Sequence, residues 1–250
     1  MITAVIFDLD GTLVQTESLK AQSYAQAAAD LHPGVAARDV VAAYDRCIGR
    51  PRNEVAQTLL DQFRLTDAAA ARAPSLGVAT PLDAFLAIRM RDYEAMLSDT
   101  ALLRRQEYPY ATALLRRVRA QGYATALTTV SHAAQAFVVL DALGVRGEFD
   151  VIVTVDDVAH GKPDPDLYLM AASRLKVAPA VCLAIEDSLP GVQAAIAAGM
   201  RCVAIANELT RDALHAASPL PGEEIVDDPS RLDTVVRQVL TTREVATVCN

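Results

Sequence analysis

Two carboxylates, Asp8 and Asp10, stand two residues apart in the segment Ile6-Phe-Asp-Leu-Asp-Gly-Thr-Leu13. They follow a short apolar run that predicts a buried strand, and Gly11 then permits a tight turn. At the end of a strand the two side chains point to the same side, and the turn lets backbone amides approach an anion. Such a pair can hold a divalent cation, because Mg²⁺ prefers carboxylate oxygens together with phosphate oxygens. By itself, the segment also fits an acidic turn at the end of a strand that has no catalytic or metal-binding role.

Three further segments carry hydroxyl, ammonium and carboxylate groups. They are Thr129-Val-Ser131, Gly161-Lys-Pro-Asp-Pro-Asp166 and Ile185-Glu-Asp-Ser188. A lone lysine is usually solvated, but two prolines stiffen the loop around Lys162 and favour a functional position. Hydroxyl and ammonium groups can hold phosphoryl oxygens, while Glu186 and Asp187 offer oxygen ligands for a cation. Thr128 stays an alternative to Thr129, because a shift of one residue exchanges the two faces of a strand.

Short apolar runs alternate with helical patterns over most of the chain. The runs cover residues 4–7, 123–128, 149–155, 181–185, 202–206 and 225–226, and the helical patterns cover 110–121, 132–143, 166–175 and 190–198. This alternation predicts an α/β fold, with a Rossmann-like parallel sheet and helices on both of its faces. Ligands of such sheets bind beyond the carboxyl ends of the strands. We therefore expect the polar segments to meet at one edge of the sheet.

Residues 15–103 interrupt the alternation. They contain no convincing strand, only helix-favouring stretches at 18–31, 38–47, 53–63 and 81–97, with a less regular segment at 73–77. We therefore expect a catalytic core formed by residues 1–14 and 104–250, and an inserted α-helical cap domain formed by residues 15–103. An insertion beside the active edge of a sheet is well placed to act as a lid.

Composition and charge narrow the classes of partner. The chain has 250 residues, of which 52% are hydrophobic, and its net charge is −8. An acidic chain without a basic tract is a poor candidate for binding nucleic acid or an anionic membrane. The start of the chain is unlike a signal peptide, and the four cysteines form no C-x-x-C pair. We expect a cytoplasmic protein with reduced thiols, without nucleic-acid or membrane partners, and with a monomer as the default.

The segments FDLDGTL, Thr129-Val-Ser131, GKPDPD and IEDS, with Ala-Ala-Gly-Met200 behind them, resemble in the same order the motifs of the haloacid dehalogenase superfamily of phosphotransferases. The resemblance covers residues 1–14 and 104–228. The helical insertion resembles that family's small α-helical cap. The most similar subgroup contains sugar-phosphate phosphatases, phosphoglycolate phosphatase-like enzymes and β-phosphoglucomutase.

The resemblance implies a catalytic role for four residues. Asp8 would be the nucleophile that attacks phosphorus and forms an aspartyl-phosphate. Asp10 would protonate the leaving alcohol and then take a proton from the attacking water, since two carboxylates in different environments can hold opposite protonation states. Thr129 and Lys162 would hold the transferring phosphoryl oxygens.

The resemblance also implies a Mg²⁺ cofactor and a small phosphorylated metabolite as partner. The ion would be held by Asp8, the main-chain carbonyl of Asp10, Glu186 and Asp187. The candidate substrate-binding residues are Gly11, Thr16, Arg52 and Ser131. Arg52 matches the arginine of the family's G-x-x-R segment, whose planar guanidinium can reach a second anionic group. Ser131 also resembles the family's hydroxyl that caps the following helix.

The expected reaction is Mg²⁺-dependent hydrolysis of a phosphate monoester, with a sugar phosphate or a phosphoglycolate-like substrate. A β-phosphoglucomutase-like phosphomutase is the main alternative, because the two enzymes share their first half-reaction and differ in whether water or a sugar hydroxyl accepts the phosphoryl group. Halide displacement is disfavoured because it needs no leaving-group acid such as Asp10. Phosphonate cleavage is disfavoured because Lys20 is the only lysine between residues 15 and 103. A non-catalytic binding protein is disfavoured because no catalytic position is missing.

Overall fold

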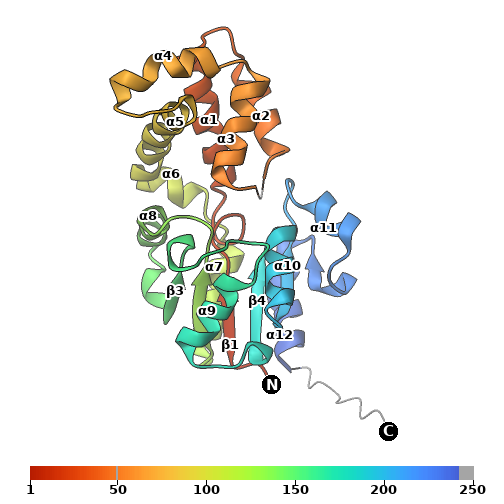
Figure 1. Cartoon of the computed structure of the whole chain (residues 1–250). Coiled ribbons are helices and arrows are strands. Elements are labelled where there is room, and N and C mark those ends of the chain that lie inside the picture. The colour runs from red at the N-terminus through yellow and green to blue at the C-terminus, as the bar shows by residue number, and fades with distance from the viewer. Residues whose placement is uncertain (49, 242–250) are drawn as a thin grey trace. The chain divides into compact units, whose positions relative to one another are not determined.

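The computed structural model describes residues 1–48 and 50–241. Within them a six-stranded parallel sheet forms in the order β3-β2-β1-β4-β5-β6 (Figure 1). The strands are β1 (Ala4–Phe7), β2 (Ala124–Thr128), β3 (Val151–Val153), β4 (Cys182–Glu186), β5 (Arg201–Ile205) and β6 (Ile225–Val226). The predicted α/β architecture with a parallel sheet is confirmed.

Helices cover both faces of this sheet. They are α7 (Pro109–Ala120), α8 (Ala133–Leu143), α9 (Asp166–Leu175), α10 (Leu189–Ala197), α11 (Arg211–Ala217) and α12 (Leu232–Thr241). Helices α9, α10 and α11 share one buried cluster with Ala4 and Ile6 of β1. Val5 and Phe7 alternate with them and are also buried, so they face the other side. This burial on both faces explains why β1 is apolar throughout its length.

The register of the central strands determines where the polar segments lie. Phe7 of β1 is paired with Leu127 on one side and with Ile185 on the other. The residues that follow Phe7 therefore leave the sheet between the carboxyl ends of β2 and β4. The amide of Asp8 still donates to the carbonyl of Ile185, at 2.9 Å. Asp8 is thus fixed at the edge where ligands of parallel sheets bind.

The chain divides into two compact units. One unit holds Met1–Val14 and the chain from Gln106 onward, and the other holds Gln15–Arg105. The second unit is helical: α1 (Glu17–Leu31), α2 (Ala37–Asp45), α3 (Arg52–Gln62), α4 (Thr66–Leu76), α5 (Pro81–Ser98) and α6 (Thr100–Arg105). It has a core of its own, with Leu59, Leu60 and Phe85 among its buried members. That this unit acts as a cap stays a prediction.

One local expectation for the second unit was wrong. Residues 73–77 were expected to be irregular because of Pro74 and Gly77, but α4 continues to Leu76 with Pro74 inside it. A proline in the last turn of a helix removes its own hydrogen bond and leaves the earlier turns intact. Ala69 and Ala73 are buried in the core of this unit and hold the helix in place. Gly77 then ends the helix in the left-handed conformation, with φ of 69°.

The structure also bears on membrane-spanning helices and on the state of the cysteines. None of the helices within the described residues is both long enough and apolar enough to cross a membrane. Cys47, Cys182 and Cys202 are buried free thiols, in keeping with the expectation of reduced cysteines. Cys249 lies outside the described residues.

Candidate active site

Asp8, Lys162 and Glu186 form a buried ion-pair network at the carboxyl edge of the sheet. The ammonium of Lys162 donates to Oδ1 of Asp8 at 2.5 Å and also donates to Oε1 of Glu186. The three side chains come from the end of β1, from the loop before α9 and from the end of β4. Each is at most 7% exposed, so solvent hardly screens their charges. Lys162 therefore links two segments that the sequence analysis had connected only by resemblance.

Burial and charge act strongly on this network. Burial, together with the neighbouring Glu186 and Asp10 carboxylates, raises the pKa of Asp8 to about 7 against the opposing effect of Lys162. Burial alone lowers the pKa of Lys162, but the carboxylates of Asp8 and Glu186 outweigh it and raise the pKa above its usual range. Negative charge thus exceeds what Lys162 neutralises, which favours the arrival of a further cation.

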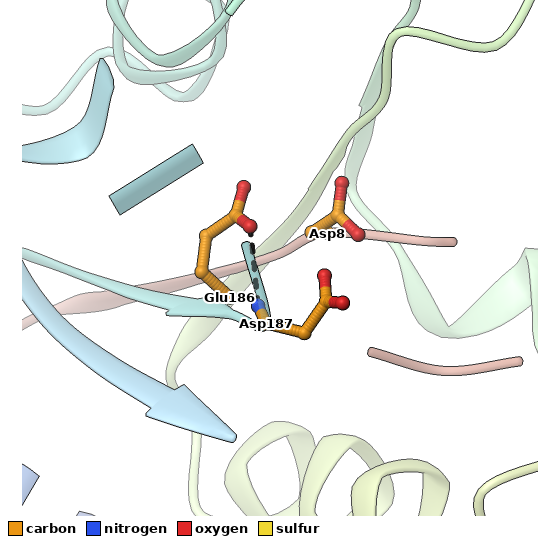
Figure 2. Close-up of side chains that lie close together, drawn as sticks. All are labelled: Asp8, Glu186 and Asp187. Carbon is orange, nitrogen blue, oxygen red and sulfur yellow. Dashed lines mark hydrogen bonds between the residues drawn. The ribbon is translucent and has the colours of Figure 1, made fainter. Parts of the chain in front are cut away.

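Three carboxylates are placed to share a cation. One oxygen each of Asp8, Glu186 and Asp187 can be chosen so that all lie within 4.8 Å of one another (Figure 2). Oδ2 of Asp8 is buried and has no hydrogen-bond partner among residues 1–48 and 50–241. A buried carboxylate oxygen without a donor is costly, and a hard cation is the ligand that such oxygens accept. These residues therefore fit the Mg²⁺ ion that the sequence analysis expects.

Two glycines allow the carboxylates to reach these positions. A Cβ atom on Gly11 would lie 2.1 Å from Oδ2 of Asp187, and Gly11 also has a positive φ of 95°. A Cβ atom on Gly191 would lie 2.1 Å from the carboxylate of Glu186. At both positions the absence of a side chain lets an acidic side chain approach closely. Gly11 was expected to bind substrate, and here its visible task is to make room for Asp187.

We expect Gly191→Ala to weaken Mg²⁺ binding by on the order of 100-fold, because the added methyl displaces the Glu186 carboxylate by more than the tolerance of a metal site. Isothermal titration calorimetry of the folded variant measures the loss. Gly147→Ala is the matched control, since a Cβ atom at Gly147 meets nothing within 4 Å. Unchanged Mg²⁺ affinity in Gly191→Ala would show that Glu186 is not a ligand.

Two hydroxyl groups in the loop after β2 contact Asp10, the second aspartate of the segment that follows β1. Ser131 Oγ donates to Oδ2 of Asp10 at 2.7 Å, and Thr129 Oγ1 lies 3.3 Å from the same oxygen. The amide of Ser131 donates to Thr129 Oγ1 at 3.0 Å and ties the loop together. Thr128 is also buried, but its hydroxyl has no partner in the described part of the chain. Of the two threonines left open by the sequence, the structure brings Thr129 to Asp10.

The expectation that Ser131 caps the following helix was wrong. Helix α8 begins after His132, and no cap residue side chain accepts a hydrogen bond there. Instead Oδ2 of Asp156 accepts from the amide of Ala133 at 2.8 Å, which satisfies an orphan donor of the first turn. The Ser131 hydroxyl is consequently available to Asp10. Asp156 is therefore the residue that anchors the start of α8.

Thr16 and Arg52 belong to the second unit. Thr16 precedes α1 and is fully buried, and Arg52 is the first residue of α3. The carbonyl of Arg52 accepts from the hydroxyl of Tyr24 at 3.4 Å. Gly49, in the same G-x-x-R segment, lies outside the described residues. The contacts of Thr16 and Arg52 with a substrate stay predictions.

Two residues that sequence reasoning missed hold the acidic cluster from behind. Tyr168 of α9 is fully buried and donates to Oε1 of Glu186 at 2.6 Å. Asn207, after β5, donates from Nδ2 to Oδ2 of Asp187 at 2.9 Å. Tyr168 was hidden in the apolar face of its helix, which predicts core packing. Asn207 had an indication in the sequence, because it ends an apolar run as the other polar residues of this edge do.

We expect Tyr168→Phe to lower the free energy of unfolding of the metal-free protein by about 1.5–3 kcal/mol, because it removes a hydrogen bond to a buried charged group and keeps the ring. Urea unfolding measures the change. Tyr123→Phe is the control, since Tyr123 is half-buried and its hydroxyl makes no hydrogen bond with the described residues. An equal effect of both substitutions would contradict the importance of the Tyr168–Glu186 bond.

The chain is similar to one protein family and to several known proteins. A model of the haloacid dehalogenase-like hydrolases matches residues 2–199. The chain is 31% identical to a phosphorylated carbohydrates phosphatase of Thermotoga maritima, over 79% of this chain and 82% of that protein. Matches to two other relatives are partial, since they cover 32% of Bacillus subtilis YhcW and 48% of an Arabidopsis thaliana bifunctional riboflavin kinase/FMN phosphatase.

Solved structures have the same fold. A β-phosphoglucomutase from Clostridium difficile superposes with a TM-score of 0.72 at 22% identity, over 96% of this chain and 97% of that one. CbbY from Rhodobacter sphaeroides, solved in complex with phosphate, superposes with a TM-score of 0.61 at 27% identity, over 84% of this chain and 89% of that one. The first similarity extends over nearly the whole chain and supports the fold.

Proposed function

Because the chain belongs to the haloacid dehalogenase-like hydrolases, we propose that this enzyme is a Mg²⁺-dependent phosphatase that acts on a small phosphorylated metabolite of the sugar phosphate class. Asp8 is the observation that carries the proposal. One of its oxygens is held by Lys162, and the other is buried without a hydrogen-bond partner in the described residues. A carboxylate that an ammonium orients from one side is suited to attack an electrophile.

In the proposed reaction, a carboxylate oxygen of Asp8 attacks phosphorus and the bond to the leaving alcohol breaks. Asp10 gives its proton to that alcohol. Water then attacks the aspartyl-phosphate and passes a proton back to Asp10, which returns both acids to their starting forms. The hydroxyls of Ser131 and Thr129 hold the Asp10 carboxyl in place throughout. Two nearby carboxyls with separate surroundings can thus serve as nucleophile and acid.

The positive charge for this reaction has two sources in the proposal. The ammonium of Lys162 orients Asp8 and can bind a phosphoryl oxygen. Mg²⁺, held by Asp8, Glu186 and Asp187 with the main-chain carbonyl of Asp10, supplies charge neutralisation for the nucleophile and the phosphate when it is bound. The similarity to CbbY, which was solved in complex with phosphate, supports phosphate as a ligand of this enzyme.

The class of substrate is proposed from the relatives and from the charge of the chain. The Thermotoga maritima relative is named for phosphorylated carbohydrates, and it matches over most of both chains. A net charge of −8 argues against nucleic acid, so a small metabolite is the expected partner. Arg52 stays our candidate for contacting a second anionic group of the substrate.

Phosphate release from a panel of metabolites, assayed with and without Mg²⁺, tests this function. The panel holds phosphoglycolate, hexose and pentose phosphates, and both anomers of glucose 1-phosphate with glucose 1,6-bisphosphate as activator. Release that needs Mg²⁺ supports the phosphatase. Formation of glucose 6-phosphate without free phosphate would instead identify a phosphomutase, because a sugar hydroxyl would have replaced water as the acceptor. If a folded protein that binds Mg²⁺ forms neither product, that result counts against the proposal.

A further inference from the structure

Tyr108 and Tyr110 form a stacked aromatic pair at the start of α7. Their ring centroids lie 5.3 Å apart, with 30° between the ring planes. Tyr108 is the N-cap residue of the helix, Pro109 follows it, and Tyr110 is in the first turn. Both side chains are only partly buried, whereas Phe7 and Tyr168 in the same unit are fully buried. Part of the aromatic surface of the pair is therefore accessible to solvent, whereas the aromatic rings of the hydrophobic core are enclosed.

The pair is attached to the loop that carries the two catalytic acids. The amide of Tyr108 donates to the carbonyl of Leu13 at 2.9 Å. Val14, next to Leu13, forms an isolated antiparallel bridge with Glu107. Leu13 is three residues beyond Asp10 in the sequence. The backbone of the tyrosine pair is thus bonded directly to the turn that follows Asp10, within the same unit.

The two phenols also lie close to the acidic cluster. Burial raises the pKa of Tyr108 to about 12, and the carboxylates of Asp187 and Glu208 add to the effect. Burial raises the pKa of Tyr110 as well, with smaller contributions from Tyr108 and Asp187. The backbone gives the same neighbourhood, because Gly11 closely approaches Asp187 and its amide donates to the carbonyl of Val14, next to the Leu13 carbonyl that accepts from Tyr108. The pair and the acidic cluster are thus joined through one turn.

The chemistry of the pair selects what it could contact. Neither phenol oxygen makes a hydrogen bond with the described residues, so both hydroxyls are available. The ring faces offer apolar surface, and the hydroxyls offer donors and acceptors beside it. The carboxylates of Asp187 and Glu208 disfavour a second anionic group at this place. The ligand group that best matches the pair is uncharged and has an apolar C–H face and several hydroxyls. A sugar ring has these properties.

We propose that Tyr108 and Tyr110 form a platform that binds the ring of a cyclic sugar phosphate and so determines substrate specificity. The inference rests on the proposed phosphatase function and names the part of the site that recognises the leaving group. The C–H face of the sugar packs against the tyrosine rings, and its hydroxyls bond to the phenol oxygens. Cyclic substrates gain this contact, and short acyclic ones do not reach it.

The experiment compares kcat/KM of wild type, Tyr108→Ala, Tyr110→Ala and Tyr110→Phe on three kinds of probe. Glucose 6-phosphate and fructose 1-phosphate are cyclic, glycerol 3-phosphate is acyclic, and uridine 5′-monophosphate carries a flat base. We expect each alanine variant to lose roughly tenfold in kcat/KM on the cyclic sugar phosphates, mainly through KM, and less than about twofold on glycerol 3-phosphate. Tyr110→Phe keeps the ring and is expected to retain most of the activity.

Tyr123→Ala is the matched control. Tyr123 is a half-buried tyrosine of the same unit that precedes β2, at the opposite edge of the sheet from the site. We expect it to leave all the ratios unchanged. Thermal unfolding of each variant shows that it is folded at the assay temperature.

Three outcomes would overturn the platform. Equal losses on cyclic and acyclic probes would mean that the pair only supports the fold of the site. Unchanged kcat/KM on every probe would mean that the substrate does not touch the pair. A loss confined to uridine 5′-monophosphate would assign the platform to a nucleobase. Failure of the proposed function is distinct from these results, since wild type would then release phosphate from none of the probes.

Discussion

Replacing Asp8 with asparagine is expected to lower phosphate release by at least about 10⁴-fold on every substrate, because an amide cannot form the acyl phosphate and removal of a nucleophile costs an enzyme that much or more. The loss should appear in kcat, since Lys162 remains to bind the phosphate, and Glu186 and Asp187 remain to hold Mg²⁺. Brief mixing with ³²P-labelled substrate and acid quenching should label wild type and leave Asp8→Asn unlabelled.

Asp10→Asn separates the two aspartates. It keeps the nucleophile and removes the proposed acid, so its loss should depend on the leaving group. p-Nitrophenolate departs without a proton, and we expect the first turnover of p-nitrophenyl phosphate to be less impaired than the first turnover of a sugar phosphate. The second step uses Asp10 for every substrate and is therefore excluded by measuring a single turnover. Asp212→Asn on the surface of α11 is the control for loss of a carboxylate, and should behave as wild type.

For the first aspartate, full activity in Asp8→Asn would contradict the aspartyl-phosphate mechanism.

Replacing Lys162 with methionine is the second large effect that we expect. Lys162 ion-pairs with both Asp8 and Glu186, and no other cationic side chain in the described ranges does so with either. Its removal leaves two buried carboxylates without their cation, which typically costs about 3–5 kcal/mol. In the absence of metal, urea unfolding should show a loss of this size. Phosphatase activity should also fall, because a phosphoryl oxygen loses its ammonium partner.

Added Mg²⁺ tests whether the lost stability of Lys162→Met comes from uncompensated negative charge. If the carboxylates are destabilising because they lack positive charge, the variant should bind Mg²⁺ more tightly, and Mg²⁺ should stabilise Lys162→Met more than it stabilises wild type at the same free Mg²⁺ concentration. Lys176→Met, at an exposed lysine of the same unit, is the control and should change neither stability nor its response to Mg²⁺. Equal stabilisation of wild type and Lys162→Met would mean that Lys162 contributes packing and not charge.

Local patterns in the sequence determined the strands and the position of the main acids. Apolar runs ending in Asp8 and in Glu186 and Asp187 predicted strand ends at a common edge, and the structure places these ends beside one another in β1 and β4. A parallel sheet collects the carboxyl ends of its strands on one side, so alternation of strands and helices was enough to predict the meeting. The helix pattern and the insertion were visible for the same reason, since periodicity is local.

The choice between neighbouring side chains was decided by the tertiary structure. Thr129 and Ser131 reach Asp10 across more than a hundred residues, and only the register of β2 beside β1 determines which threonine does so. Ser131 was free to bind Asp10 because Asp156, from a third segment, satisfies the amide that begins α8. A sequence pattern gives the face of an element, but not the partner across the sheet.

The supporting residues depended on tertiary structure for the same reason. Tyr168 has the pattern of a core residue, and its hydroxyl becomes functional only because α9 packs over the end of β4 and brings it to Glu186. Tyr108 and Tyr110 gave no motif, and only the fold joins Tyr108, through the bond to Leu13, to the turn that follows Asp10. The sequence by itself thus determined the candidate reacting groups and the edge where they gather. Their partners were decided by the folded chain, because hydrogen bonds and burial join residues that no local pattern connects.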